Sequence, residues 1–71
     1  MKRKYNIGDL VRITTTAKDP MNYLSGTIVD IRRIKASDDN YIQYKVKIPT
    51  SFGFHLGIYG EENLIFVKRD D

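Results

Sequence analysis

Side chains that commonly carry out acid–base or metal chemistry are sparse in this 71-residue chain. His55 is the only histidine, and the chain contains no cysteine. A catalytic histidine needs a nucleophile or an orienting carboxylate beside it, and no such spacing can be argued from the sequence. Glu61 and Glu62 are adjacent on a predicted turn, so their carboxylates should diverge instead of acting as a pair. We therefore expect a non-enzymatic protein without a metal site or cofactor.

Basic side chains form the most informative constellation. The net charge is +3, which permits an anionic partner without requiring one. Five cations gather in the middle of the chain, at Arg32, Arg33, Lys35, Lys45 and Lys47. A hairpin should place Arg32 across from Lys45 and Arg33 across from Tyr44, to within a residue or two. An anion would neutralise this crowding. Alternatively, the exposed lysines only discourage edge-to-edge pairing of sheets.

Aromatic side chains accompany these cations. Five tyrosines and three phenylalanines exceed what a small core can hold, and aromatic rings beside cations supply stacking platforms and phosphate neutralisation for single-stranded nucleic acid. Two alternatives are an aromatic cage for a cation and tyrosines that cap the ends of the domain. The candidate nucleic-acid-binding residues are Arg32, Arg33, Lys35, Tyr41, Lys45 and Lys47.

The elements that must position these residues alternate with a period of two, which predicts strands and no helix. The expected strands cover residues 9–16, 24–36, 41–48, 52–59 and 64–67. Residues 17–23 form a loop, residues 37–40 form a hairpin turn, and Pro49 ends the third strand. The second strand needs a bulge near Val29–Asp30 to restore its alternation.

The chain is short enough for one domain, residues 1–71, with a basic N-terminal tail at 1–6 and a C-terminal tail at 69–71. Inward parity along the strands selects the core residues. These are Ile7, Val11, Ile13, Ile28, Ile31, Ile42, Tyr44, Val46, Ile48, Leu64 and Phe66.

Four short motifs occur in a characteristic order: Gly8-Asp9-x-Val11-x-Ile13, Gly26-x-Ile28-x-x-Ile31, Tyr44-x-Val46-x-Ile48 and Glu61-x-x-Leu64. Together they resemble the KOW and Tudor-like branch of SH3-like barrels over residues 7–67. The resemblance implies an all-β fold, a five-stranded SH3-like barrel with at most a single 3-10 turn. Residues 17–23 are longer than the corresponding KOW loop and lack its glycine-rich tip. A short, charged, self-contained barrel also resembles small proteins of bacteriophages and mobile elements.

The fourth predicted strand, from Phe52 to Tyr59, contains no Lys, Arg, Asp or Glu. An uncharged strand is poorly protected at the edge of a sheet. We therefore expect it to be covered by residues 17–23 or, in preference, by another chain, either a second copy or a foreign protein. The candidate partner-interface residues are Phe52, Phe54 and Tyr59.

These patterns predict a cytoplasmic binding module that acts on nucleic acid or a nucleoprotein machine. The alternative is a protein-interaction or inhibitor module that docks on a host protein through a strand edge. A third, enzymatic reading rests on the segment Leu56–Tyr59, which is similar in place to the pore-lining strand of type II dihydrofolate reductase, although Gly57 replaces the glutamine of that motif. No apolar run approaches the roughly 20 residues of a membrane span, so no membrane partner is expected.

Overall fold

The computed structural model describes residues 4–36 and 39–69. Within these residues the chain forms one antiparallel sheet of five strands, and a single 3-10 turn precedes the last strand. The predicted all-β fold class is therefore confirmed. The elements are β1 (Leu10–Ile13), β2 (Ser25–Ala36), β3 (Asp39–Thr50), β4 (Gly53–Gly60), η1 (Glu61–Asn63) and β5 (Leu64–Lys68).

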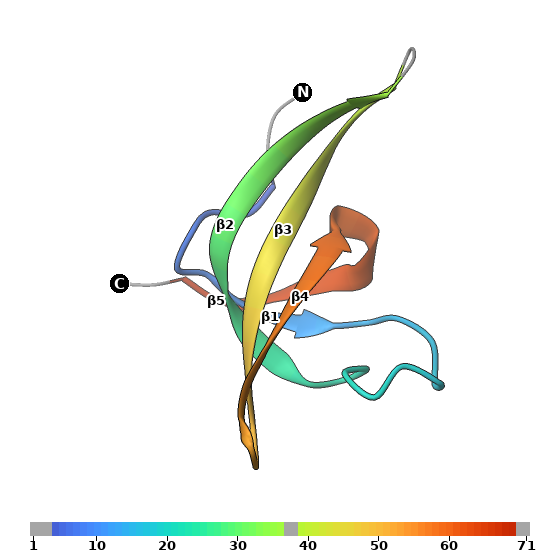
Figure 1. Ribbon diagram of the computed structural model, residues 1–71. Helices are drawn as coiled ribbons and strands as arrows, with labels where there is room; N and C mark the ends of the chain where they lie inside the picture. The colour runs from blue at the N-terminus through green and yellow to red at the C-terminus, as the bar shows by residue number, and fades with distance from the viewer. Residues whose placement is uncertain (1–3, 37–38, 70–71) are drawn as a thin grey trace.

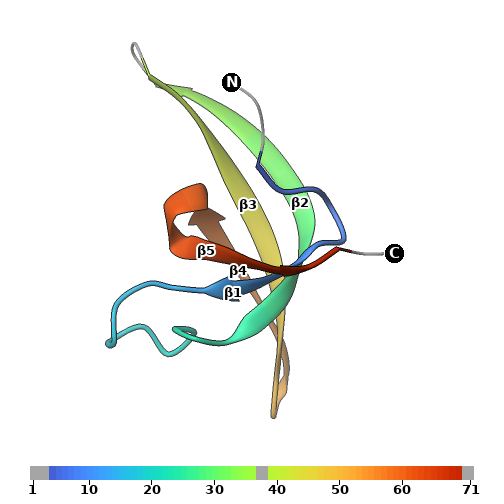
Figure 2. The same ribbon diagram turned by 180° about the vertical axis from the view of Figure 1, so that it is seen from behind.

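The order of the strands across the sheet is β4-β3-β2-β1-β5, which places β4 and β5 at the two edges. The long β2–β3 hairpin curves through the whole molecule, and its far end extends beyond the other strands (Figure 1). β1 pairs with β2 only over residues 25–27, and β4 pairs with β3 from residue 43 onward. Seen from behind, β5 and β1 cross the lower part of this hairpin (Figure 2).

The second strand contains the irregularity that its sequence predicts. Ile28 pairs with Val46 and Asp30 pairs with Lys45, so Val29 is an extra residue in the β2–β3 ladder. The side-chain carboxylate of Asp30 accepts the backbone N–H of Ile31 over 2.9 Å at this point. The bulge lets Ile28 and Ile31 face the same side of the sheet although their positions differ in parity.

Several boundaries differ from the sequence-based expectation: the first strand ends at Ile13 instead of residue 16, and both ends of the third strand are shifted. β3 begins at Asp39, within the predicted turn, and the remaining turn residues 37–38 lie outside the described part of the chain. The strand also continues through Pro49 to Thr50, so the expectation that Pro49 ends it is wrong. Pairing with β2 stops at Lys47, which leaves Pro49 with β4 as its only neighbour. A proline is tolerated at this position because its missing N–H is not needed for hydrogen bonds to strands on both sides.

The core lies on the inner side of the curved sheet and confirms most of the predicted residues. Ile31 is partly buried and packs against it. The expectation is wrong for Ile7, which is 60% exposed because it lies in the turn closed by the N–H of Asp9 and the carbonyl of Asn6. The buried set is Tyr5, Val11, Ile13, Ile28, Ile42, Tyr44, Val46, Ile48 and Leu64.

Phe66 lies on the edge strand β5 and is 45% exposed, so it is also not one of the buried core residues. Its ring stacks on the ring of Tyr5, with the two centroids 6.5 Å apart. Tyr5 itself is only 2% exposed, although residues 1–6 are expected to form a tail. Residues 1–3 and 70–71, the outer parts of the two expected tails, lie outside the described residues.

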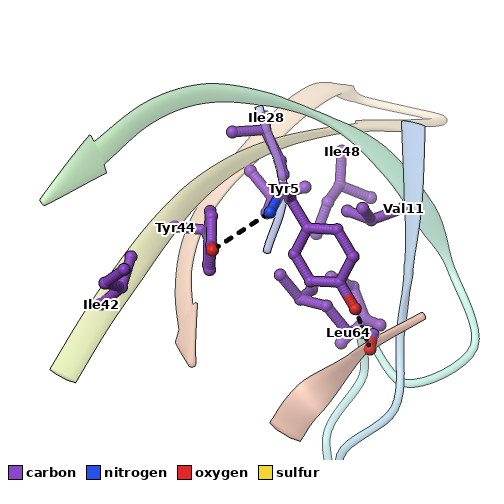
Figure 3. Close-up of a cluster of buried hydrophobic side chains, with 9 residues drawn as sticks. Tyr5, Val11, Ile28, Ile42, Tyr44, Ile48 and Leu64 are labelled. Atoms are coloured by element: carbon purple, nitrogen blue, oxygen red, sulfur yellow. Dashed lines mark hydrogen bonds between the residues drawn. The ribbon is translucent and has the colours of Figure 1, made fainter. Parts of the chain in front are cut away.

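Tyr5 and Tyr44 join distant parts of the chain through their polar atoms (Figure 3). The hydroxyl of Tyr44 accepts the backbone N–H groups of Lys4 and Tyr5, over 3.0 and 3.3 Å, and donates to the carboxylate of Glu61 over 3.0 Å. The hydroxyl of Tyr5 donates to the carbonyl of Leu64 over 3.1 Å. These bonds connect the N-terminal segment with β3, η1 and the start of β5.

Truncation of Val46 should destabilise the fold, because this side chain is fully buried between neighbouring core residues. We expect Val46→Ala to lower the free energy of unfolding by about 1–3 kcal/mol. The control Ile65→Ala removes an exposed side chain and should change it by less than about 0.5 kcal/mol. Urea denaturation measures both values, and equal losses would contradict the assigned core.

Stability should also depend on pH through Tyr44. Burial raises the pKa of this phenol above its usual value of 10.0. The fold therefore favours the neutral form, and the free energy of unfolding should fall as pH rises from 10.0 through the folded-state pKa. Tyr44→Phe should be less stable at pH 7 but should lose less stability above pH 10. Burial also raises the pKa of Tyr59, so the Tyr44→Phe variant will still show part of the loss of stability above pH 10. Parallel stability curves for the two proteins would contradict this role for Tyr44.

Candidate nucleic-acid interface

The alternation of β3 separates an apolar side from a polar one. Ile42, Tyr44, Val46 and Ile48 are all buried. The intervening side chains point to the outer side of the sheet, where Tyr41 is 42% exposed. The outward row consists of Tyr41, Gln43, Lys45 and Lys47, as the sequence predicts.

The β2–β3 register differs by two residues from the expected pairing. Arg32 lies opposite Gln43 instead of Lys45, and Arg33 lies opposite Ile42 instead of Tyr44. The cause is the hairpin turn, because pairing continues as far as Ala36 and Asp39. Arg32 still belongs to the outer side, next to the outward row of β3.

The residue that actually faces Lys45 on β2 is an acid, Asp30. One carboxylate oxygen of Asp30 lies 3.6 Å from Nε of Arg32, and both side chains are well exposed. Such an exposed ion pair contributes little to stability. It does lower the positive charge at the centre of the row. The sequence indicates the contact between Asp30 and Arg32, because the two residues are two positions apart on one face of the strand. The residue that faces Lys45 depends on the exact position of the bulge.

Phe54 of β4 joins the same surface. It pairs with Pro49 in the β3–β4 ladder and is 58% exposed. Nζ of Lys47 lies 4.3 Å from the centroid of the Phe54 ring, a cation–π contact. The sequence predicts Phe54 in a protein interface and gives no indication of its contact with Lys47. We call the combined surface the basic outer face, which comprises Arg32, Tyr41, Gln43, Lys45, Lys47 and Phe54.

Two predicted nucleic-acid-binding residues do not belong to the basic outer face. Arg33 and Lys35 alternate with Arg32 and Ile34 along β2, so their side chains start from the opposite side of the hairpin. Both are exposed. The six candidates are therefore divided between two faces, because a strand sends neighbouring residues in opposite directions.

The three predicted partner-interface residues are likewise not on one surface. Phe52 lies in the β3–β4 turn and is fully exposed, whereas Phe54 belongs to the basic outer face. Tyr59 is half-buried and packs against the core from the inner side. Its ring lies so close to Gly57 that a Cβ there would be 2.6 Å from it.

A separate cleft of about 270 Å³, which no sequence pattern indicates, lies between the N-terminal segment and β5. It is lined by Lys4, Tyr5, Asn6, Asp9, Phe66 and Arg69. The carboxylate of Asp9, at 5% exposure, accepts the backbone N–H of Asn6 over 2.9 Å. This acid therefore shapes the turn that leads into β1.

Residues 4–36 and 39–69 contain no group of three or more acidic or histidine side chains arranged to hold a metal ion. His55 is exposed on β4, opposite Ile48. Among the same residues, no helix is long and apolar enough to cross a membrane. Cations and aromatic rings gather in two places, on the basic outer face and around the cleft with Lys4, Tyr5, Phe66 and Arg69.

Comparison with protein families, with curated proteins and with solved structures finds no match to this chain.

Proposed function

We propose that this protein is a non-enzymatic binding module that holds single-stranded nucleic acid, free or within a nucleoprotein complex, on the basic outer face. The observation that carries the proposal is the contact of Lys47 with the exposed ring of Phe54. Lys45 and Tyr41 lie on the same side of the sheet, farther along β3. A base can stack on an aromatic ring while a neighbouring cation neutralises its phosphate, and this pairing tolerates any sequence.

The dimensions of the face are compatible with a short strand of nucleic acid. Tyr41 and Pro49, the partner of Phe54, are separated by eight residues along β3. At ~3.3 Å per residue this distance is about 26 Å. Two aromatic rings with two lysines between them would then serve about four nucleotides, the lower end of site sizes for small barrels.

Charge supports the same partner. Arg32, Lys45 and Lys47 contribute three cations to the face, and Asp30 contributes one neighbouring acid. A phosphate that displaces Asp30 from Arg32 costs little stabilisation, because the ion pair between these two exposed side chains is weak. The rival function is docking on a protein, and it rests on strand β4, which contains no Lys, Arg, Asp or Glu. The salt dependence of binding distinguishes the two functions, because only nucleic-acid binding should weaken steeply as salt rises.

The first test reverses the two lysines together. Lys45→Glu/Lys47→Glu should weaken binding to dT15 and rU15 oligonucleotides alike and should flatten the plot of log K against log salt by about 1.4, or ~0.7 for each phosphate contact on a single strand. Fluorescence anisotropy at several salt concentrations measures both quantities. The matched control is Lys18→Glu/Lys68→Glu, which makes the same change in net charge at exposed sites outside the basic outer face.

The second test removes the stacking ring. Tyr41→Ala should cost about 1–3 kcal/mol of binding free energy and leave the salt slope unchanged, because it removes stacking and no charge. The side chain is 42% exposed, so the fold should tolerate the change.

Two outcomes would refute the proposal. One is that the wild-type chain binds neither oligonucleotide at ~20 mM salt, where phosphate contacts are strongest. The other is that the control double variant weakens binding as much as Lys45→Glu/Lys47→Glu, which would reduce the effect to net charge. The first outcome, together with a partner whose binding is insensitive to both salt and nuclease, would favour protein docking.

A further inference from the structure

The two edges of the sheet differ in their protection against another strand. β5 has a bulge at Val67, where the β1 register shifts, ends at Lys68 and is followed by Arg69. Bulges and edge cations prevent strands from pairing further. β4 pairs regularly with β3 along its whole length and, in the described part of the chain, has no strand on its other side. One edge is therefore blocked and the other is open.

β4 also exposes apolar side chains beside this open edge. Phe54, Leu56 and Ile58 alternate on its outer side and are 58, 48 and 55% exposed. None of the eight residues from Gly53 to Gly60 is a lysine, arginine, aspartate or glutamate. For a chain with a net charge of +3, this strand can approach a second copy without placing lysines or arginines opposite each other.

The sequence of β4 is complementary to itself in an antiparallel pair. With Leu56 on a two-fold axis, Leu56 faces its own copy and Phe54 faces Ile58 of the other chain, so the apolar outer side continues across both chains. On the inner side, His55 faces Gly57 of the other chain, where the ring of Tyr59 already covers the glycine, so the imidazole would lie against that ring. The cross-strand apolar pairs of the outer side are favourable combinations in antiparallel sheets.

Other registers fit less well. A two-fold axis at Gly57 would place Phe54 opposite Gly60, and an axis at His55 would place Ile58 opposite Phe52, which lies in the turn beyond the strand. Either shift leaves one of the three outer side chains without an apolar partner in the sheet. The order of residues in β4 therefore favours the register about Leu56 over the other registers of a second copy.

The area available reaches the range of a specific dimer. The chain exposes 5302 Å² over 71 residues, so eight residues carry roughly 600 Å² at the mean value. Two copies would then bury roughly 1,200 Å² in total, the lower limit of standard protein interfaces.

We infer that the open edge of β4 binds the β4 strand of a second copy of this chain, in antiparallel register about Leu56. The sheets of the two copies then join into one, and the interaction uses the backbone edge and the flanks of Phe54, Leu56 and Ile58. The inference does not rest on nucleic-acid binding.

Cysteine cross-linking tests the register directly, because the natural chain has no cysteine. Residues directly opposite each other have Cα atoms about 4.5–5.5 Å apart, within the range of a disulfide. Leu56→Cys should therefore form a covalent dimer on mild oxidation. Phe54→Cys should do so at least about tenfold more slowly, because its two copies would be ~14 Å apart. A mixture of Phe54→Cys and Ile58→Cys should cross-link as fast as Leu56→Cys.

Sedimentation equilibrium tests the affinity without a new thiol. Leu56→Lys places two ammonium groups opposite each other and should raise the dissociation constant at least about tenfold. The control Ile65→Lys changes an exposed residue of β5 by the same charge and should leave it within about twofold. Thermal melting of each variant verifies that it is folded.

Three results would overturn the inference. They are a wild-type chain that remains monomeric at ~1 mM, a dimer that Leu56→Lys and Ile65→Lys weaken equally, and Phe54→Cys cross-linking as rapidly as Leu56→Cys. Loss of oligonucleotide binding alone would bear on the proposed function and leave the dimer intact.

Discussion

The buried hydroxyl of Tyr44 is the constraint from which the arrangement of this protein follows. An unpaired hydroxyl in an apolar core is costly. Here the oxygen accepts two N–H groups of the N-terminal segment and its proton goes to Glu61. These bonds can form only when Tyr44 points inward. The alternation of β3 then directs Lys45 and Lys47 outward, so the hydrogen bonds inside the fold determine which cations reach the surface.

The basic outer face and the open edge share β4 without competing for it. Phe54 projects from the outer side of the sheet, near Lys47, whereas the backbone edge of the strand points sideways within the sheet. A ligand that lies on the sheet and a strand that extends it therefore approach from perpendicular directions. Joining two sheets would place two basic outer faces side by side, and a longer nucleic acid would then find contacts on both copies.

Local patterns predicted much of the fold, and long-range pairing accounts for what they missed. The alternation from Ile42 to Ile48 and the broken parity after Ile28 each reflect a single strand, so β3 and the bulge could be inferred. The contact between Asp30 and Arg32 and the one between Lys47 and Phe54 depend on registers set by turns, and several turn positions fit the same residues. Tyr5 lies among basic and polar neighbours, so no periodicity reveals that its ring completes the core.

The pairing of β1 with β5 has a consequence for synthesis on the ribosome. β2, β3 and β4 follow one another in the chain and pair as neighbours, so this meander can assemble while the chain is still emerging. Val11 and Ile13 belong to a strand that also needs β5, and Tyr5 donates to the carbonyl of Leu64 across almost the whole sequence. The core therefore closes only after residues 64–68 have left the exit tunnel. Until then the first strand is an exposed apolar segment, and its protection depends on the rate at which the last strand arrives.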